Sequence, residues 1–306
     1  MPLRILKAVL YLASVATAAV GVLGLVLWWW PASVGVVLGA VGRFEVCRFD
    51  EAVAGVEGKL TLDEVTQALR SKVRELETDK QAGLTRWDAP DGKYWVPSDT
   101  GAILPVLLAQ QETHIYGFVK PGEIVLDGGA HVGVYTRRAL DAGAKLVVAI
   151  EPAPDNIECL KRNFAAEIAA GRVIVYPKGV WDKDDVLELK TVRGNSAGDS
   201  FVISYGPGER LQLPLTTIDK LVDELKLERV DRIKLDIKGA EQQALRGAAG
   251  VIKRFRPKLA VATEHHPDDY VKIPKLIAEL RPNSKIACGA CFVSKYRIVP
   301  ETLLVD

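Results

Sequence analysis

Short apolar runs alternate with longer helical patterns through the second half of the chain, and this order constrains the fold most strongly. Strands are expected at 124–127, 146–150, 173–177, 232–237 and 258–263. Helices are expected at about 134–142, 154–169 and 241–253. Because parallel neighbouring strands need a crossover between them, the alternation predicts an α/β fold with a doubly wound, mostly parallel sheet and helices on both faces.

The loop after the first of these strands is rich in glycine. It reads Asp127-Gly128-Gly129-Ala130-His131-Val132-Gly133, which is D-x-G-x-x-x-G and not the G-x-G-x-x-G of dinucleotide-binding loops. An acid inside the loop would repel a pyrophosphate, but it suits a ligand with positive charge, such as the sulfonium and amino group of S-adenosylmethionine (SAM). The alternative is that Asp127 caps the next helix and the glycines only make a tight turn.

A second acid, Glu151, follows the strand at 146–150. A carboxylate at the end of this strand binds a ribose diol in related folds, and open parallel sheets bind ligands at the carboxyl ends of their strands. The glycine loop and this acid together predict a SAM site that is formed by Asp127, Gly129, His131, Gly133 and Glu151.

Charged side chains recur on the strand at 232–237 and after the strand at 258–263. Lys234, Asp236 and Lys238 are spaced by two and therefore share one face. Charges on a central strand are unfavourable unless they are paired or used, so the choice is between a structural ion pair and a reaction site beside the SAM loop. We favour the reaction site, because Glu264-His265-His266 arrives at the neighbouring strand end.

These residues suggest chemistry on a hydroxyl group. Methyl transfer from a sulfonium is an in-line displacement, and a hydroxyl acceptor must also lose its proton to a nearby base. We predict His266 as that base, because a free imidazole has a pKa near ~6.5, with Asp236 or Glu264 orienting it and Lys234 beside them. The alternative is an Mg²⁺ ion on Asp236 and Glu264. Two carboxylates are an incomplete ligand set, so no metal is predicted.

The motifs resemble the FkbM family of class I methyltransferases. They are D-x-G-A-x-x-G, then E-P-x-P-x-N from Glu151, T-x-D at Thr217–Asp219, K-x-D-x-x-G-x-E from Lys234, and a strand ending E-x-H. The match covers about residues 88–270, and it implies a SAM-dependent enzyme that acts on hydroxyls of sugars and natural products. Two positions depart from the family pattern: His131 stands where Asn is usual, and Lys238 where Glu is usual.

The N-terminal 43 residues differ from the rest of the chain. No charged residue lies between Lys7 and Arg43, and a spanning helix needs about 20 apolar residues. We predict a membrane anchor over 1–43, with a transmembrane or monotopic helix from about residue 4 to 30 and a surface-lying or re-entrant piece to 42. A cleaved signal peptide is the alternative, because Ala16-Thr17-Ala18 resembles a cleavage site. However, the apolar stretch continues far past it.

Residues 44–87 are predicted to form an amphipathic connector. Within it, the stretch from Thr61 to Leu76 predicts a helix that starts at a capping box of Thr61 and Glu64. Residues 88–306 are assigned to the catalytic domain. That domain is predicted to contain a small hairpin around 93–96, a helix at about 103–118 and a β-hairpin insertion at 184–215.

The net charge and the cysteine content limit which partners and which cellular compartment are expected. The net charge is +1, so no nucleic-acid partner is predicted. Four cysteines are too few and too scattered for a disulfide framework, and no Asn-x-Ser/Thr acceptor occurs, which suits a reducing compartment. Cys288-Gly-Ala-Cys291 lacks the second pair that a zinc site needs.

The sequence therefore predicts a membrane-anchored, SAM-dependent methyltransferase acting on a hydroxyl of a sugar, lipid or lipid-linked glycan. Its expected partners are the lipid bilayer, a lipid or glycan acceptor and, as a further option, a second copy through the N-terminal helices. Because SAM is a cytosolic metabolite, the catalytic domain is expected to face the cytoplasm. The alternatives are a non-catalytic membrane scaffold that keeps the SAM fold and an NAD(P)-dependent oxidoreductase.

Overall fold

A computed structural model describes residues 14–15, 17–22, 24, 46–294 and 297–306. Most of the predicted anchor at 1–43 lies outside these residues, and the few that are described there are helical. Within the described part of the chain, no helix is both long and apolar enough to cross a membrane. The anchor and its signal-peptide alternative stay predictions.

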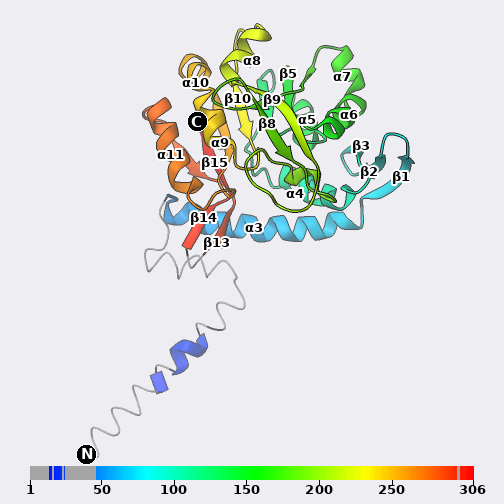
Figure 1. The fold of residues 1–306 in the computed structure, drawn as a ribbon. Helices are drawn as coiled ribbons and strands as arrows, with labels where there is room; N and C mark the ends of the chain where they lie inside the picture. Colours follow the sequence, from blue (N-terminus) through cyan, green and yellow to red (C-terminus); the bar gives the residue numbers. More distant parts are fainter. Residues whose placement is uncertain (1–13, 16, 23, 25–45, 295–296) are drawn as a thin grey trace, which may run out of the picture.

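The central sheet has the strand order β12-β15-β11-β10-β4-β5-β6 (Figure 1). Five of its strands run parallel: β4 (Ile124–Gly128), β5 (Leu146–Ile150), β6 (Val173–Tyr176), β10 (Arg232–Leu235) and β11 (Lys258–Ala262). β15 (Thr302–Val305) is antiparallel to both β11 and β12 (Ile286–Cys288). Since the strand order turns back between β4 and β10, the sheet is doubly wound and mostly parallel, as predicted.

Helices cover both faces because successive strand residues point to opposite sides. Leu126 of β4 and Val148 of β5 belong to one apolar core, whereas Val125 and Val147 belong to the other. The first core is completed by α8 (Ile218–Glu224), α9 (Glu241–Arg246), α10 (Ala249–Phe255) and α11 (Asp269–Leu280). The second is completed by α5 (Val134–Asp141), α6 (Pro154–Asn163) and α7 (Ala165–Ala169).

Two of the predicted helices are interrupted where the packing requires it. The helix expected at 154–169 breaks between α6 and α7 at Phe164, whose φ is −123° and whose ring is fully buried. The helix expected at 241–253 breaks between α9 and α10 at Gly247. Its backbone passes so close to Trp181 that an added Cβ would lie 1.9 Å from the Trp181 carbonyl oxygen.

The connector helix differs from the prediction at both ends. α3 (Phe49–Arg70) begins where the Arg48 N–H donates to Glu51 Oε2 at 3.1 Å. Thr61 lies inside this helix and donates to the Glu57 carbonyl oxygen at 3.0 Å, so the capping box at Thr61 is wrong. The helix stops before Leu76, because the chain there enters β1 (Arg74–Asp79).

The predicted boundary between residues 87 and 88 falls inside a strand. β1, β2 (Leu84–Ala89) and β3 (Gly92–Pro97) form a three-stranded antiparallel sheet in that order. α3 also buries Leu62 and Leu69 in one core with α4 (Leu104–Glu112). η1 (Gly101–Ile103) precedes α4, which ends well before residue 118. The residues from α3 onward therefore pack with the catalytic domain and do not form a separate connector.

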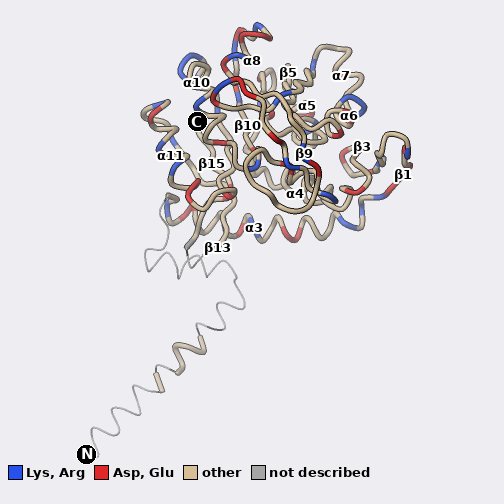
Figure 2. The backbone as a smooth tube through the Cα atoms, in the orientation of Figure 1, with Lys and Arg blue, Asp and Glu red and all other residues tan. Residues whose placement is uncertain are grey.

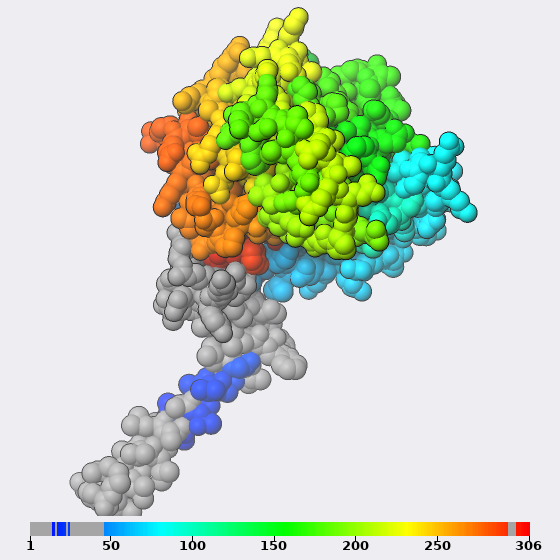
Figure 3. All heavy atoms as spheres, in the orientation of Figure 1, coloured from blue at the N-terminus to red at the C-terminus, as the bar shows by residue number. Residues whose placement is uncertain are grey.

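The predicted insertion is a hairpin of β8 (Asp185–Lys190) and β9 (Arg210–Thr216), joined by β7 (Gly179–Val180) in the order β7-β9-β8. The long loop between β8 and β9 contains η2 (Ser196–Gly198). In Figure 3 this yellow-green segment lies on the front of the molecule, beside the orange residues that follow β11. A second hairpin, β13 (Cys291–Ser294) and β14 (Arg297–Pro300), was not predicted.

One disulfide joins residues that are far apart in the sequence. Cys47, just before α3, is bonded to Cys288 at the end of β12, 241 residues later. The buried thiol of Cys291 lies 4.0 Å from Cys47 Sγ. Spacing alone could not reveal this pair, because only the fold brings the start of α3 to the edge of the sheet.

Candidate active site

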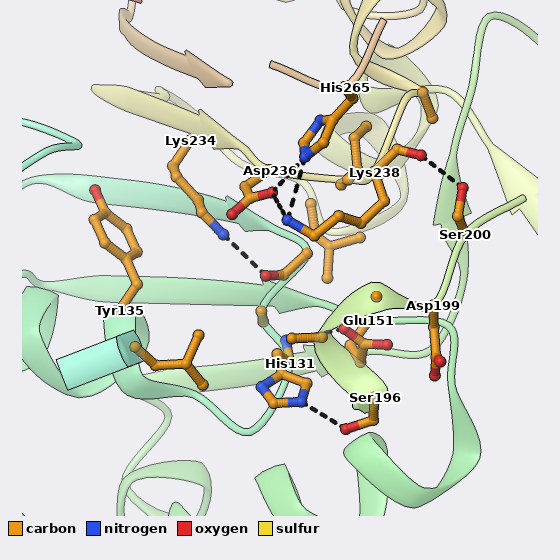
Figure 4. A pocket seen from close by; sticks show the side chains of 18 of the residues that line it. His131, Tyr135, Glu151, Ser196, Asp199, Ser200, Lys234, Asp236, Lys238 and His265 are labelled. Atoms are coloured by element: carbon orange, nitrogen blue, oxygen red, sulfur yellow. Dashed lines mark hydrogen bonds and ion pairs between the residues drawn. The ribbon is translucent and has the colours of Figure 1, made fainter. Parts of the chain in front are cut away.

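A cavity of about 450 Å³ lies at the carboxyl ends of β4, β5, β10 and β11, where the strand order reverses (Figure 4). Open α/β sheets bind ligands at such a point. Six of the nine predicted site residues line this cavity, and they include Glu264 from the end of β11. The others are Gly129, His131, Glu151, Lys234 and Asp236, of which His131 departs from the family pattern.

The glycine loop is bent tightly enough to exclude side chains. Gly129 has φ +73°, and an added Cβ would lie 2.0 Å from the Asp236 carbonyl oxygen. Gly133 has φ +94°, and an added Cβ would lie 2.2 Å from the Phe164 ring. These two glycines therefore hold the loop against β10 and α6. Gly133 positions the loop without lining the cavity itself.

Lys234 also positions this loop, through hydrogen bonds to its backbone. Its ammonium donates to the carbonyl oxygens of Gly128 at 3.1 Å and Gly129 at 2.9 Å. It also lies 3.1 Å from Asp127 Oδ1, although the geometry there is that of an ion pair without a good hydrogen bond. Asp127 is fully buried and takes a further hydrogen bond from Thr136. Asp127 was predicted to meet the positive charge of SAM, but its own negative charge is already balanced by Lys234.

Glu151 is buried at the cavity wall and retains acceptor capacity. Its oxygens accept from the backbone N–H groups of His131 at 2.9 Å and Ala153 at 3.0 Å, and from Asn156 at 3.3 Å. A carboxylate has about four acceptor positions, so Oε2 can still take a hydroxyl of a ribose diol. Burial raises the pKa of Glu151, and these hydrogen bonds oppose that rise.

His131 supplies a buried polar atom without a partner. Its Nε2 pairs with Ser196 Oγ at 2.7 Å, whereas Nδ1 has no hydrogen-bond partner. Burial, helped by Lys238 and Lys234, lowers the pKa of His131 to about 3, so the imidazole is neutral at physiological pH. An orphaned polar atom in a cavity wall indicates a ligand, and with the free position on Glu151 it fits a SAM-sized molecule.

The reaction side of the cavity is built on Asp236. Oδ1 accepts from Lys238 Nζ at 2.6 Å, and Oδ2 accepts from Tyr116 Oη at 2.7 Å. Burial alone would raise the pKa of Asp236, but the charges of Lys238 and Lys234 hold it well below its usual range. Asp236 is therefore an anion that accepts hydrogen bonds.

Of the two histidines that follow β11, His265 lines the cavity and the predicted base His266 does not. His265 Nδ1 pairs with Glu241 Oε1 at 2.9 Å, and its Nε2 lies 3.2 Å from Lys238 Nζ and 3.5 Å from Asp236 Oδ1. His266 Nε2 instead pairs with the Gly239 carbonyl oxygen at 3.1 Å, and this residue does not line the cavity. The side chains of consecutive residues after a strand point in different directions, so a motif alone does not show which of the two histidines faces the cavity.

The charges around His265 set its pKa. Burial lowers its pKa, but the Glu241 carboxylate outweighs burial, so the pKa of His265 lies above its ordinary value. Glu241 is fully buried and also accepts from the N–H groups of Ile237 at 2.8 Å and Gly239 at 3.0 Å. A histidine held through Nδ1 by a carboxylate presents Nε2 as its proton acceptor.

One group of donors in the described chain has the spacing of a metal site. Oxygen or nitrogen atoms of Asp236, Glu241 and His265 lie within 4.8 Å of one another. Glu264, which was predicted as the alternative magnesium ligand, is not in this group. The Lys238 ammonium already lies against two of its three members.

Several residues that line the cavity were missed by sequence reasoning. Tyr116 and Tyr135 place their rings 5.4 and 5.8 Å from Lys234 Nζ, and the Tyr135 hydroxyl is buried without a partner. Asp199, from the loop between β8 and β9, has its pKa raised to about 7 by burial. Tyr116 and Asp199 come from segments that the sequence does not connect to the strand ends, whereas Tyr135 lies two residues beyond the glycine motif but is not part of it.

Comparison with known proteins identifies the family of the chain. Residues 127–285, just over half of the chain, match the model of the methyltransferase FkbM domain. The chain therefore belongs to the FkbM methyltransferase family. No protein with a curated description matches the sequence.

Two solved structures illustrate the likeness. Methyltransferase FkbM from Methylobacillus flagellatus KT is 18% identical, with a TM-score of 0.46 over 80% of this chain and 58% of that one. Trm5b from Pyrococcus abyssi is 16% identical, with a TM-score of 0.41 over 73% of this chain and 55% of that one. The chain thus spans little more than half the length of either protein.

Proposed function

We propose that this protein is a SAM-dependent methyltransferase directed at a hydroxyl group. The observation that supports this best is the convergence, in one cavity, of the glycine loop, Glu151 and the pair of Asp236 and His265. The first two suit the cofactor and the last two suit the acceptor. When bound, SAM supplies an electrophilic methyl group.

The side chains of the cavity have separate tasks in this proposal. Glu151 binds the ribose diol, and the neutral His131 offers Nδ1 to a polar group of the cofactor. His265 takes the acceptor proton at Nε2, and Glu241 steadies the resulting imidazolium through Nδ1. Loss of this proton would leave the acceptor oxygen ready to receive the methyl group that SAM would supply.

Titration calorimetry on the full chain tests the cofactor. We expect SAM to bind, Glu151→Ala to bind it at least about tenfold more weakly through the lost charge-assisted hydrogen bonds, and NADH to give no heat. NADH binding with no response to SAM would instead support the oxidoreductase. A folded protein that binds neither would leave the non-catalytic scaffold.

We further propose that the acceptor is a lipid or lipid-linked glycan at a membrane, with the catalytic domain on the cytoplasmic side. Apolar residues of η1 and α4, namely Ile103, Val106 and Leu107, line the cavity and suit an acceptor with an apolar part. The charge-free stretch before Arg43 supports the anchor. Figure 2 shows basic and acidic residues interspersed over the described elements, which gives no support to a nucleic-acid acceptor.

Two measurements test this part of the proposal. Transfer of radioactive methyl from SAM into the lipid extract, and its loss in His265→Ala, would support the acceptor class. Protease should digest the catalytic domain in inverted vesicles and spare it in right-side-out vesicles. The reverse pattern would place the domain on the other side.

A further inference from the structure

We propose that Lys238 is the built-in cation of this active site, and that its ammonium group stands where a divalent metal ion would otherwise bind. The statement about cation binding is independent of the proposed function. The consequence for the acceptor rests on it.

The donors around the ammonium have the arrangement of an ion site. Lys238 Nζ lies 2.6 Å from Asp236 Oδ1 and 3.2 Å from His265 Nε2, and those two atoms are 3.5 Å apart. Divalent ions bind oxygen and nitrogen at about 2.0–2.6 Å, which puts neighbouring ligand atoms roughly 3–4 Å apart. The same donors would therefore suit a metal ion if the ammonium were absent.

The backbone fixes Lys238 in this place. Its φ is +53°, a conformation that lysine rarely adopts, and it is followed by Gly239 at +100°. Ser200 Oγ donates to the Lys238 carbonyl oxygen at 2.6 Å, while Glu241 accepts from the N–H groups on either side of Lys238. The turn is thus held from two directions, and the side chain folds back over Asp236 (Figure 4).

The surrounding charges need one cation. The Asp236 side chain is 15% exposed and that of Glu241 is fully buried, and Glu264 adds a third carboxyl nearby, 3.9 Å from His265 Nε2. The Lys238 ammonium forms an ion pair with the Asp236 carboxylate, with Nζ 2.6 Å from Oδ1, and so supplies that cation. A divalent ion a few ångströms from this charge would be strongly repelled, so the two cations exclude each other.

A fixed ammonium gives the acceptor what a metal would give. Lysine has three N–H donors, and Asp236 Oδ1 takes one of them at 2.6 Å. Another can hydrogen-bond the acceptor oxygen and stabilise the negative charge that develops as the proton passes to the lone pair of His265 Nε2, which lies 3.2 Å from Lys238 Nζ. Substrate binding on this site then needs no metal cofactor.

Manganese titration followed by electron paramagnetic resonance tests the inference on the full chain. Lys238→Ala should bind Mn²⁺ at least about a hundredfold more tightly than the natural protein, because the competing charge is gone and the two donors that Lys238 contacts are freed. Adding Asp236→Asn to that variant should abolish the binding. Lys253→Ala, at an exposed position of α10, is the matched control and should behave like the natural protein.

The outcomes separate the two proposals. Tight Mn²⁺ binding by the natural protein that Asp236→Asn removes would overturn the inference, since Lys238 would not exclude the ion. A folded Lys238→Ala variant that still binds SAM but gains no Mn²⁺ affinity would also overturn it. If the gain is seen in a protein that never binds SAM, the proposed function fails while the cation assignment stands.

Discussion

Gly133→Ala should destabilise the protein far more than an alanine at an open glycine. Gly133 precedes α5 with φ +94°, and an added Cβ would lie 2.2 Å from Phe164 Cε2 and 2.7 Å from Cζ. Phe164 is fully buried and marks the break between α6 and α7, so its ring has little room to retreat. Gly171 has φ +68° with nothing within 4 Å, and it serves as the control.

The two substitutions share one penalty and differ in the other. A non-glycine residue in the left-handed region costs about 1–2 kcal/mol, which applies to both sites. Overpacking a filled core adds about 1–3 kcal/mol, which applies only to Gly133. We therefore expect a loss of roughly 2–5 kcal/mol in the free energy of unfolding for Gly133→Ala and about 1–2 kcal/mol for Gly171→Ala.

Equilibrium urea unfolding of both variants measures the difference. SAM titration adds a functional reading, because displacement of the loop at Gly133 should weaken binding while Gly171→Ala leaves it unchanged. Equal losses of stability in the two variants would refute the reasoning, since the contact with Phe164 would then cost nothing.

Three further predictions follow from buried charges and the disulfide. Lys234→Met should lower the free energy of unfolding in urea by about 3–5 kcal/mol, because it leaves Asp127 unpaired. Adding Asp127→Leu should restore most of that stability but not SAM binding. A Lys234→Met variant as stable as the natural protein would contradict the pairing. Glu241 raises the pKa of His265, so the pair contributes stability that is complete below pH ~6.5 and is lost as the pH rises through the pKa of the folded protein. Glu241→Gln should abolish this loss of stability and move the acidic limb of the pH–rate profile to lower pH. An acidic limb that does not move would exclude His265 as the base. Cys47→Ser opens a loop of 241 residues and should lower stability by up to about 5 kcal/mol; dithiothreitol should lower the melting temperature of the natural protein but not of this variant.

Local patterns specified the parts of the fold that depend on near neighbours in the sequence. The parallel strands were predicted within two residues, because each apolar run is bounded by turn residues. Helix ends were predicted less well. Thr61 and Glu64 have the form of a capping box, yet α3 runs through them because Leu62 and Leu69 are buried against α4. Packing outweighs a cap whose contribution is about 1 kcal/mol.

The sequence also determined which strand ends carry the chemistry. Glu151 follows an apolar strand and Asp236 follows a strand in which charged and apolar residues alternate, and the carboxyl ends of parallel strands meet at one edge of the sheet. What each charge does was decided by tertiary structure. Asp127 is matched by Lys234, His265 rather than His266 enters the cavity, and Cys47 meets Cys288 across 241 residues. Motifs record the order of residues along the chain, whereas pairing and access depend on distances that only the packed fold fixes.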